Sequence, residues 1–401
     1  MSKAKYMKIS EFCDTGSGTT PSRQKSELYY GGSIPWIKSG ELRESLITEC
    51  EEKVTELALK ETSLKIVPSG ALLVAMYGAT VGRIGRLGIE ATTNQAVCHI
   101  LPNPKIADNQ YMFYALQNKT SEFVSKGVGG AQPNISQGTI KDTSIYLPPL
   151  EEQKRIAAIL DQADALRRQR QRALNRLNQL GQSIFYEMFG DWRNEPNASL
   201  TKLGDHLDFL TSGSRGWAEY YSDEGSLFLR IQNVKNDKLD LTDIAFVNAP
   251  ETAESKRTRV KTGDVLLSIT ADLGRTAVIP ANFPDAYINQ HLAILRTSYF
   301  NPRFLSAAFS SPAGQSTVLK RNRAGVKAGL NFDDIKSFEL PDVERGKQEE
   351  FDKRMQAVDA QIELQQRELI KLNSLFSCLQ HRAFRGELGT GLKSGIKGAA
   401  A

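Results

Sequence analysis

The chain has 401 residues, of which 40% are hydrophobic and 24% are charged, a composition of globular proteins rather than of disordered or fibrous ones. The formal net charge of +5 is compatible with a nucleic-acid partner but does not require one. The four cysteines show no CxxC spacing, so we expect no disulfide framework and a cytoplasmic location. We see no signal peptide, and no apolar run reaches the roughly 18 residues that span a bilayer, so no membrane contact is expected.

Residues 1–149 have the pattern of an α+β domain. Short apolar runs at 71–76 and 96–101 are bounded by Gly, Pro or Asn and predict strands. Residues 109–119 have the pattern of a short amphipathic helix. Between the strands lies YGATVGRIGRLGIEATTNQ (77–95), which has four glycines. Its spacing fits neither GxxxxGK[ST] nor GxGxxG, so we interpret these glycines as sites of sharp backbone turns rather than as a nucleotide pocket.

Two long helices are predicted, over 150–190 and 344–386. Apolar residues recur at heptad spacing over about five heptads in each, which favours a coiled coil about 55 Å long. In the first helix, one heptad position carries Ile156, Ala163, Leu177 and Ile184, and a second carries Ile159, Leu166, Ala173 and Leu180. In the second helix, the matching residues are Met355, Val358, Ile362, Leu369, Leu372, Phe376 and Leu379.

A polar residue interrupts each apolar stripe near its middle. These residues are Arg170 and Gln365, which are 195 residues apart. In an antiparallel pair of helices the two midpoints meet, so we predict that Arg170 and Gln365 share a polar layer that fixes the register. The alternative is that both side chains face solvent.

Residues 197–343 repeat the first domain. VPSGALLVAM (67–76) matches VKTGDVLLSI (260–269), and NQAVCHIL (94–101) matches NQHLAIL (289–295). IKDTSIYLPPLEEQ (140–153) matches IKSFELPDVERGKQ (335–348), and the blocks keep their order in both halves. This pattern predicts two copies of one domain, with the divergent segments as loops. Residues 387–401 are small and polar and are interpreted as a flexible tail.

These blocks resemble the specificity (S) subunit of type I restriction–modification enzymes. The resemblance rests on GATVGR…TTNQAVC (78–98), LPPLEEQKRIAAILDQAD (147–164) and LQHRAFRGEL (379–388), and it covers nearly all of residues 1–388. It implies two target-recognition domains, each reading one half of a bipartite site in double-stranded DNA. Two antiparallel helices would hold the domains apart, and two modification subunits would methylate adenine. Those partners, and any restriction subunits, would carry S-adenosylmethionine, ATP and Mg²⁺, with no cofactor in this chain.

No catalytic or metal site emerges from the residues themselves. An adenine methyltransferase would show [ND]PP[YFW], but FNPRF (300–304) lacks the second proline, and we interpret Asn301 and Pro302 as a helix start. PDVERGK (341–347) has the residues of a nuclease site but not their spacing. The four histidines form no zinc pattern. The chain is therefore interpreted as non-catalytic.

Candidate DNA contacts cluster in the divergent segment before each IK block, SKGVGGAQPNISQG (125–138) and LKRNRAGVKAG (319–329). Amides suit adenine edges and guanidinium groups suit guanine, whereas lysines suit phosphates. The base-reading candidates are Gln132, Asn134, Arg321 and Arg323, and the phosphate candidates are Lys126, Lys320 and Lys327. Arg83 and Arg275 follow the matched glycine turns, and Lys38 and Arg230 each follow a predicted strand. The alternative is ordinary surface loops with solvated charges.

Five arginines lie close together on the first long helix: Arg167, Arg168, Arg170, Arg172 and Arg176. They are either a solvated face with ion pairs or a contact with DNA between the half-sites. For the whole chain, two further function classes stay open. One is a stand-alone sequence-specific regulator that binds DNA tightly by itself. The other is a protein-interaction scaffold without salt-dependent DNA affinity.

Overall fold

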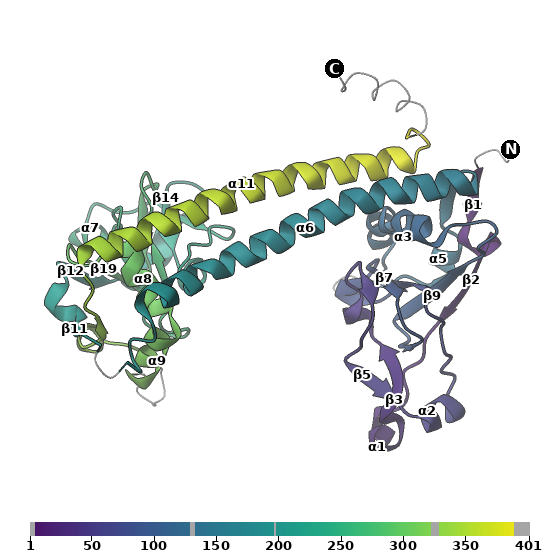
Figure 1. The fold of residues 1–401 in the computed structure, drawn as a ribbon, viewed down its shortest axis with the longest axis horizontal. Coiled ribbons are helices and arrows are strands. Elements are labelled where there is room, and N and C mark those ends of the chain that lie inside the picture. The colour runs from purple at the N-terminus through teal and green to yellow at the C-terminus, as the bar shows by residue number, and fades with distance from the viewer. Residues whose placement is uncertain (1–4, 129–132, 196–197, 322–328, 389–401) are drawn as a thin grey trace. The chain divides into compact units, whose positions relative to one another are not determined.

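A computed structural model describes residues 5–128, 133–195, 198–321 and 329–388. The chain divides into two compact units (Figure 1). Unit 1 comprises Met1–Gln171 with Arg367–Ala401, and unit 2 comprises Arg172–Gln366. Each unit combines an α+β domain with a stretch of each of two long helices, α6 (Leu150–Phe189) and α11 (Arg345–Ala383).

The described part of unit 1 has three sheets, ordered β2-β9-β6-β7-β4, β5-β3-β8 and β1-β10. Their strands are β1 (Lys5–Lys8), β2 (Cys13–Ser17), β3 (Tyr30–Ile37), β4 (Leu46–Ile47), β5 (Glu52–Val54), β6 (Leu72–Ala75), β7 (Ile84–Leu87), β8 (Thr92–Thr93), β9 (Val97–Pro102) and β10 (Ser144–Leu147). The shorter helices are α1 (Ser26–Tyr29), α2 (Glu56–Glu61), α3 (Asn109–Gln117), α4 (Thr120–Ser125) and α5 (Gln137–Lys141).

The described part of unit 2 also has three sheets, ordered β12-β19-β16-β17, β13-β15-β14-β18 and β11-β20. Their strands are β11 (Leu200–Lys202), β12 (Phe209–Ser212), β13 (Tyr221–Ser222), β14 (Ser226–Leu229), β15 (Ala245–Val247), β16 (Val265–Ser268), β17 (Thr276–Val278), β18 (Ala286–Ile288), β19 (Leu292–Arg296) and β20 (Glu339–Pro341). The shorter helices are α7 (Ala253–Thr258), α8 (Pro302–Ser310), α9 (Pro312–Arg321) and α10 (Phe332–Lys336). Helix α8 begins as predicted, because the Asn301 side chain accepts hydrogen bonds from two N–H groups of its first turn.

The strand pairings of the two units correspond, which confirms the duplication. In unit 1, Leu72 of β6 pairs with Ile100 of β9, and in unit 2 Val265 of β16 pairs with Leu295 of β19. A parallel pair recurs as well, β3 with β8 and β14 with β18. The first strand of each domain closes on its last, since β1 pairs with β10 and β11 pairs with β20. Each domain therefore ends at the strand that leads into a long helix.

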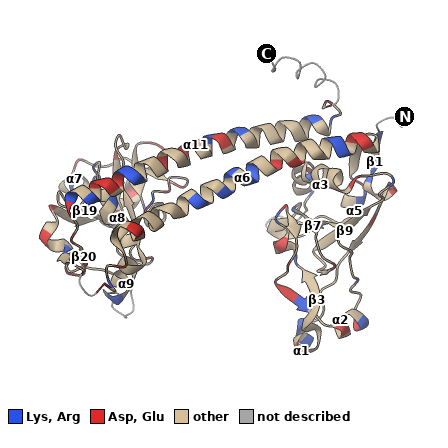
Figure 2. Cartoon of the chain, in the orientation of Figure 1, with Lys and Arg blue, Asp and Glu red and all other residues tan. Residues whose placement is uncertain are grey.

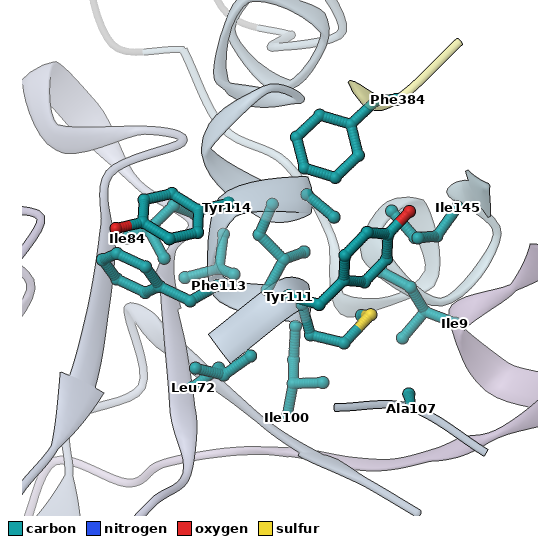
Figure 3. Close-up of a cluster of buried hydrophobic side chains, with 14 of the residues drawn as sticks. Ile9, Leu72, Ile84, Ile100, Ala107, Tyr111, Phe113, Tyr114, Ile145 and Phe384 are labelled. Atoms are coloured by element: carbon teal, nitrogen blue, oxygen red, sulfur yellow. The ribbon is translucent and has the colours of Figure 1, made fainter. Parts of the chain in front are cut away.

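Helix α3 occupies the centre of the unit 1 core (Figure 3). The short helix predicted over 109–119 is present, but all six residues from Tyr111 to Leu116 are buried, so its amphipathic pattern does not correspond to a solvated face. The reason is that α6 covers the face the sheet leaves open, where the Tyr114 hydroxyl donates to the Asp161 carboxylate at 2.7 Å. In unit 2, α8 is buried in the same way from Phe304 to Ser310.

A buried glutamine joins each long helix to its domain. Gln153 and Gln348 are each only 1% exposed and are 195 residues apart. The Gln153 amide oxygen accepts from the N–H of Asp108 at 2.8 Å, and that of Gln348 accepts from the N–H of Asn301 at 2.7 Å. Each amide nitrogen donates to a carbonyl five residues earlier. Both glutamines thus bond to equivalent backbone groups, including the N–H of the residue that caps α3 or α8. These bonds hold each long helix to its domain.

The long helices pack antiparallel in each unit. In unit 1, Arg167 of α6 donates to Asn373 of α11 at 2.8 Å. In unit 2, the rings of Phe185 of α6 and Phe351 of α11 lie 5.5 Å apart. The residue numbers along α6 therefore increase while those of the contacting residues on α11 decrease, as an antiparallel coiled coil requires.

The predicted seam agrees better with α11, where Leu369, Leu372 and Leu379 are half-buried and the other predicted residues are buried, than with α6. The predicted Met355, Val358, Ile362 and Phe376 of α11 are buried. On α6, one predicted heptad position is exposed at Leu166 (52%) and Leu180 (40%). Leu160 and Leu174 are buried instead. Spacings of three and four residues both continue a heptad stripe, so the sequence alone did not decide which neighbour faces inward.

Asp237 is a poorly solvated carboxyl group in unit 2. It has a backbone φ of +59° and accepts a hydrogen bond from the Ser306 hydroxyl of α8. Burial raises the pKa of Asp237 to about 6, although Ser306 and Arg303 act in the opposite direction. Ionisation of Asp237 therefore opposes folding.

Asp237→Asn is expected to raise the free energy of unfolding at pH 8 by about 1–3 kcal/mol. The pKa of Asp237 in the folded state, about 6, exceeds its value in the unfolded chain. The free energy of unfolding therefore falls as pH rises from about 4 to 6, and above pH 6 this contribution to stability is lost completely. Asparagine keeps the acceptor for Ser306 and tolerates a positive φ.

Denaturant unfolding at pH 4 and pH 8 measures this effect, and the gain should be absent at pH 4. Asp240→Asn is the control, because hydrogen bonds from Thr242 lower the pKa of Asp240 and its replacement should give no such gain. An equal change for Asp237→Asn at both pH values would contradict the interpretation.

Candidate nucleic-acid interface

The glycine-rich stretch after β6 is a tight turn. Gly78 and Gly82 have φ of +66° and +78°, a backbone region that favours glycine. A Cβ on Gly82 would lie 3.1 Å from the Thr120 carbonyl oxygen, so the close approach of α4 also selects glycine. Gly274 has φ of +82° at the matched place in unit 2. The prediction that the glycines of this stretch serve backbone turns is confirmed at Gly78 and Gly82, but Gly85 lies inside strand β7.

In unit 1, the divergent loop lies directly beside this turn. Val128 and Asn134 close the loop through two backbone hydrogen bonds of 3.0 Å each. The N–H of Gly78 donates to the Pro133 carbonyl at 2.9 Å, and Asn134 forms a β-bridge with Tyr77. Pro133 and Asn134 of the loop therefore lie directly beside the turn.

Unit 2 repeats this arrangement. Gly329 forms a β-bridge with Thr270, which follows β16 as Tyr77 follows β6. The N–H of Leu330 donates to the Ile269 carbonyl at 2.9 Å. The two divergent segments, far apart in the sequence, are thus attached at matched positions of the two domains.

The described candidates in unit 1 are exposed on this surface. Arg83 and Asn134 are both exposed, and no acidic side chain pairs with Arg83 among the described residues. Lys126 forms an ion pair with Glu122 at 2.6 Å, which partly neutralises it. Gln132 lies outside the described residues. Arg83 is therefore the most available cation of this set.

In unit 2, Lys320 is exposed near the end of α9, and Arg321 is the last residue of that helix. Arg323 and Lys327 lie outside the described residues. Arg275 forms an ion pair with Asp272 at 2.5 Å, whereas its counterpart Arg83 has no acidic partner among the residues that the structure describes. The two matched arginines thus differ in how readily they can meet a phosphate.

Lys38 and Arg230 hold equivalent places but are both paired with acids. Each follows its strand, β3 or β14, and caps a short 3₁₀ turn. Lys38 contacts Glu51 at 2.8 Å and Glu52 at 3.3 Å. The hydrogen bond to Glu51 raises the pKa of Lys38 above its ordinary value. Arg230 contacts Asp243 at 3.1 Å. These pairs reduce the positive charge that either residue can offer to DNA.

Two of the helix arginines are also engaged within the protein. Basic and acidic residues both occur along α6 and α11 (Figure 2), but no acidic residue lies between Asp164 and Glu187 of α6. Arg167 and Arg168 both pair with Asp164, at 3.2 and 2.5 Å. Arg168 also donates to the carbonyl of Glu44 at 2.9 Å. For these two arginines the ion-pair interpretation is the one that the contacts support.

Sequence reasoning missed two exposed side chains beside the turn. Tyr77 is 42% exposed and is bridged to the divergent loop. Gln95 is exposed, and its neighbour Ala96 accepts a hydrogen bond from Met76 at 2.8 Å. The recurrence of the NQ pair at 94–95 and 289–290 is the signal that could have identified Gln95. An aromatic ring and an amide at such a surface are both suited to nucleic-acid contact.

Within the described ranges, no group of three or more His, Cys, Asp or Glu side chains is placed to hold a metal ion. In the same ranges, no helix has the combination of length and apolar character that crossing a bilayer requires. The four cysteines are free thiols, as expected.

Comparison with known proteins identifies relatives along most of the chain. The model of the type I restriction modification DNA specificity domain matches residues 1–178 and 222–374. The type I restriction enzyme MjaIX specificity subunit of Methanocaldococcus jannaschii is 27% identical over 326 residues, covering 74% of this chain and 73% of that protein. The EcoKI specificity subunit of Escherichia coli is 25% identical over 392 residues, covering 88% and 82%.

Solved structures agree on the fold. One chain from a study of the assembly of the type I restriction–modification system has a TM-score of 0.62 and 19% identity, covering 96% of this chain and 98% of that one. The S subunit of such a system from M. genitalium has a TM-score of 0.55 and 16% identity, covering 95% and 96%. Because the family model spans both copies of the repeated domain, this chain belongs to the family of type I restriction modification DNA specificity domains.

Proposed function

We propose that the chain is the non-catalytic DNA-recognition subunit of a type I restriction–modification system. The domains at 1–149 and 197–343 would each read one half of a bipartite target in double-stranded DNA. The observation that carries this proposal is the matched attachment of two divergent loops beside two equivalent glycine turns. A repeated scaffold with unlike loops is suited to reading two different half-sites with one geometry.

Within each surface, backbone and base contacts would be divided by residue type. Arg83, which is exposed, and Lys320 are suited to phosphate contact. Asn134, with Gln132 beside it in the sequence, is suited to adenine edges, and the arginines of 319–329 to guanine. Lys126 and Lys327 would contact phosphates, and the paired Lys38, Arg230 and Arg275 would contribute less.

The two long helices would set the gap between the half-sites. At about 1.5 Å per residue, the 40 residues of α6 extend roughly 60 Å, compared with about 34–36 Å for one turn of DNA. Arg170 and Gln365 are each half-buried, and we propose that they fix the helix register. Replacing both by leucine should allow shifted alignments, measured by cysteine crosslinking along the helices.

Two modification subunits would bind this chain and methylate adenine, and restriction subunits would join them. S-adenosylmethionine, ATP and Mg²⁺ would be used by those partners, in the cytoplasm. The long helices expose apolar side chains that a protein partner would cover. They are Leu166 (52%), Leu180 (40%), Leu364 (45%), Ile370 (65%) and Leu375 (49%). We propose that these side chains contribute to a protein-docking surface.

Arg83→Ala is expected to weaken DNA binding about equally for all sequences and to lower the salt slope of binding by about 1. The reason is that Arg83 is exposed and unpaired among the described residues, as a phosphate contact requires. Arg275→Ala is the matched control and should have a smaller effect, because Asp272 already neutralises Arg275. Affinities of the assembled complex for target and scrambled duplexes, between about 50 and 200 mM salt, measure both. A loss confined to one DNA sequence would contradict the phosphate assignment.

The proposed function is tested by footprinting the chain on target DNA with and without its modification subunits. The complex should protect two separated tracts on one duplex. Protection of one continuous tract by the isolated chain would favour a stand-alone regulator, and no salt-dependent DNA affinity in any assembly would favour a scaffold.

A further inference from the structure

Unit 2 contains a cavity of 560 Å³ that the recognition surface does not use. Its walls come from α6, α8, α11 and the segment 236–239. Phe185, Met355 and Val358 provide buried apolar walls. This volume is large enough to hold a ring-bearing group.

Unit 1 has a counterpart at the matched place, and that counterpart is largely filled. It measures 220 Å³ and is lined by Phe113 and Tyr114 of α3. Helices α3 and α8 are both nine residues long and begin 193 residues apart, so Tyr114 corresponds to Ala307. By the same offset Phe113 corresponds to Ser306, and the offset of 195 between the long helices places Gly181 at the position of Phe376. Three aromatic side chains of unit 1 are thus replaced by Ala, Ser and Gly in unit 2.

The unit 1 arrangement shows which group fits this place in the fold. The Tyr114 ring lies 5.9 Å from that of Phe376, and its hydroxyl donates to the Asp161 carboxylate at 2.7 Å. Figure 3 shows Tyr114 among the buried side chains of the unit 1 core. The site therefore accommodates an aromatic ring whose tip donates a hydrogen bond to a carboxylate.

Carboxylates also line the open cavity of unit 2. Asp237 accepts from Ser306, and Asp359 pairs with Arg303 at 2.5 Å. Arg303 also contacts Asp352 at 3.4 Å, so two carboxylates share one guanidinium group. The lining has acceptor capacity for a donor from outside the chain.

We propose that this cavity receives an aromatic side chain with a hydrogen-bond donor at its tip, presented by a modification subunit. The inference rests on the proposed function for the identity of that partner. A protein source fits the surroundings, because the lining residue Tyr186 is a large aromatic side chain that is 64% exposed. A partner that covers this side chain would bury the cavity mouth and fill it in the same step.

The proposal also predicts that the two docking places for modification subunits differ. At unit 1 the chain supplies the ring itself through Tyr114, whereas at unit 2 the ring comes from the partner. The two subunits would therefore bind with unequal affinity.

The test fills the cavity with the residue that unit 1 uses. Ala307→Tyr should close it, and Ala218→Tyr, at an exposed position of unit 2, is the matched control. The probe is 4-methylphenol, and its binding is followed through the ¹³C-labelled methyl group of Met355. Met355 and Gly181 both line the cavity, and the Met355 methyl carbon lies only 2.8 Å from where a Cβ on Gly181 would stand. Thermal unfolding checks that Ala307→Tyr folds, and Ala307→Leu is used in its place if it does not.

We expect 4-methylphenol to shift the Met355 signal saturably in the unmodified chain and in Ala218→Tyr. Filling the cavity should abolish the shift and weaken binding of one modification subunit at least tenfold. An unmoved Met355 signal would overturn the proposal, as would full-affinity assembly of the filled variant, which would assign the cavity to a free aromatic ligand instead. Failure of the unmodified chain to assemble at all would refute the proposed function, while the 4-methylphenol result would still report on the cavity.

Discussion

Replacing Arg321 and Arg323 together by alanine is expected to relax recognition of one DNA half-site and to leave the other unchanged. Both arginines belong to the divergent segment of unit 2, in which Arg321 is the last residue of α9 and Arg323 lies outside the described residues. Each bidentate contact with guanine contributes about 1–3 kcal/mol of discrimination, so each one lost should lower discrimination roughly 5- to 150-fold. Methylation of oligonucleotides randomised in one half-site at a time, by the assembled complex, measures the effect.

Lys320→Ala is the matched control for this pair. Lysine suits phosphate better than a base edge, so this variant should lower methylation of all sequences about equally. If the double arginine variant behaved like Lys320→Ala, the base-reading assignment would be wrong. If both half-sites relaxed together, the assignment of one half-site to each unit would be wrong.

Phe376→Ala is expected to lower the free energy of unfolding of unit 1 by about 3–5 kcal/mol. Phe376 is 6% exposed and packs on Tyr114 with ring centroids 5.9 Å apart. The Arg167 guanidinium lies 4.3 Å from its ring centroid. The substitution removes the contacts of Phe376 with Tyr114 of the domain and with Arg167 of α6, and it leaves a cavity that its neighbours fill only partly.

Leu375→Ala controls for helix propensity and position, because Leu375 is the adjacent residue and is 49% exposed. The free energy of unfolding of the Leu375→Ala variant should differ from that of the unmodified chain by no more than about 0.5 kcal/mol. Denaturant titration of the full chain, with both units followed separately by hydrogen exchange, measures the two variants. Equal destabilisation by both, or a loss confined to unit 2, would contradict the packing described here.

The repeat and the long helices were predictable because they depend on patterns that recur along the sequence. Matched blocks 193–195 residues apart identified two copies of one domain, and heptads identified the ends of α6 within one residue and those of α11 within three. The burial of α3 was not predictable, since α6 covers its second face from a later part of the sequence. Likewise, nothing local distinguishes Leu160 from Ile159 as a seam residue until the domain is packed against the helix.

The segments that make up the candidate site could be identified from the sequence, but the ion pairs of its charged residues could not. The divergent loops and glycine turns were both identified from the sequence, and the structure brings them together through the bridges at Asn134 and Gly329. The pairing of Lys38 and Arg275 with acids was not predictable, because it depends on where Glu51 and Asp272 come to lie. The cavity beside Ala307 was missed for a related reason. A small residue in one copy has meaning only beside the aromatic residue that it replaces in the other.

The central claim is that two unlike loops on one repeated scaffold read two half-sites for a methyltransferase. Methylome sequencing of cells that express this chain with its modification subunits tests that claim most directly. We predict one bipartite motif, with N6-methyladenine in both halves and a fixed gap between them, and the motif should be absent without this chain. A continuous motif, or an unchanged methylome, would contradict the account.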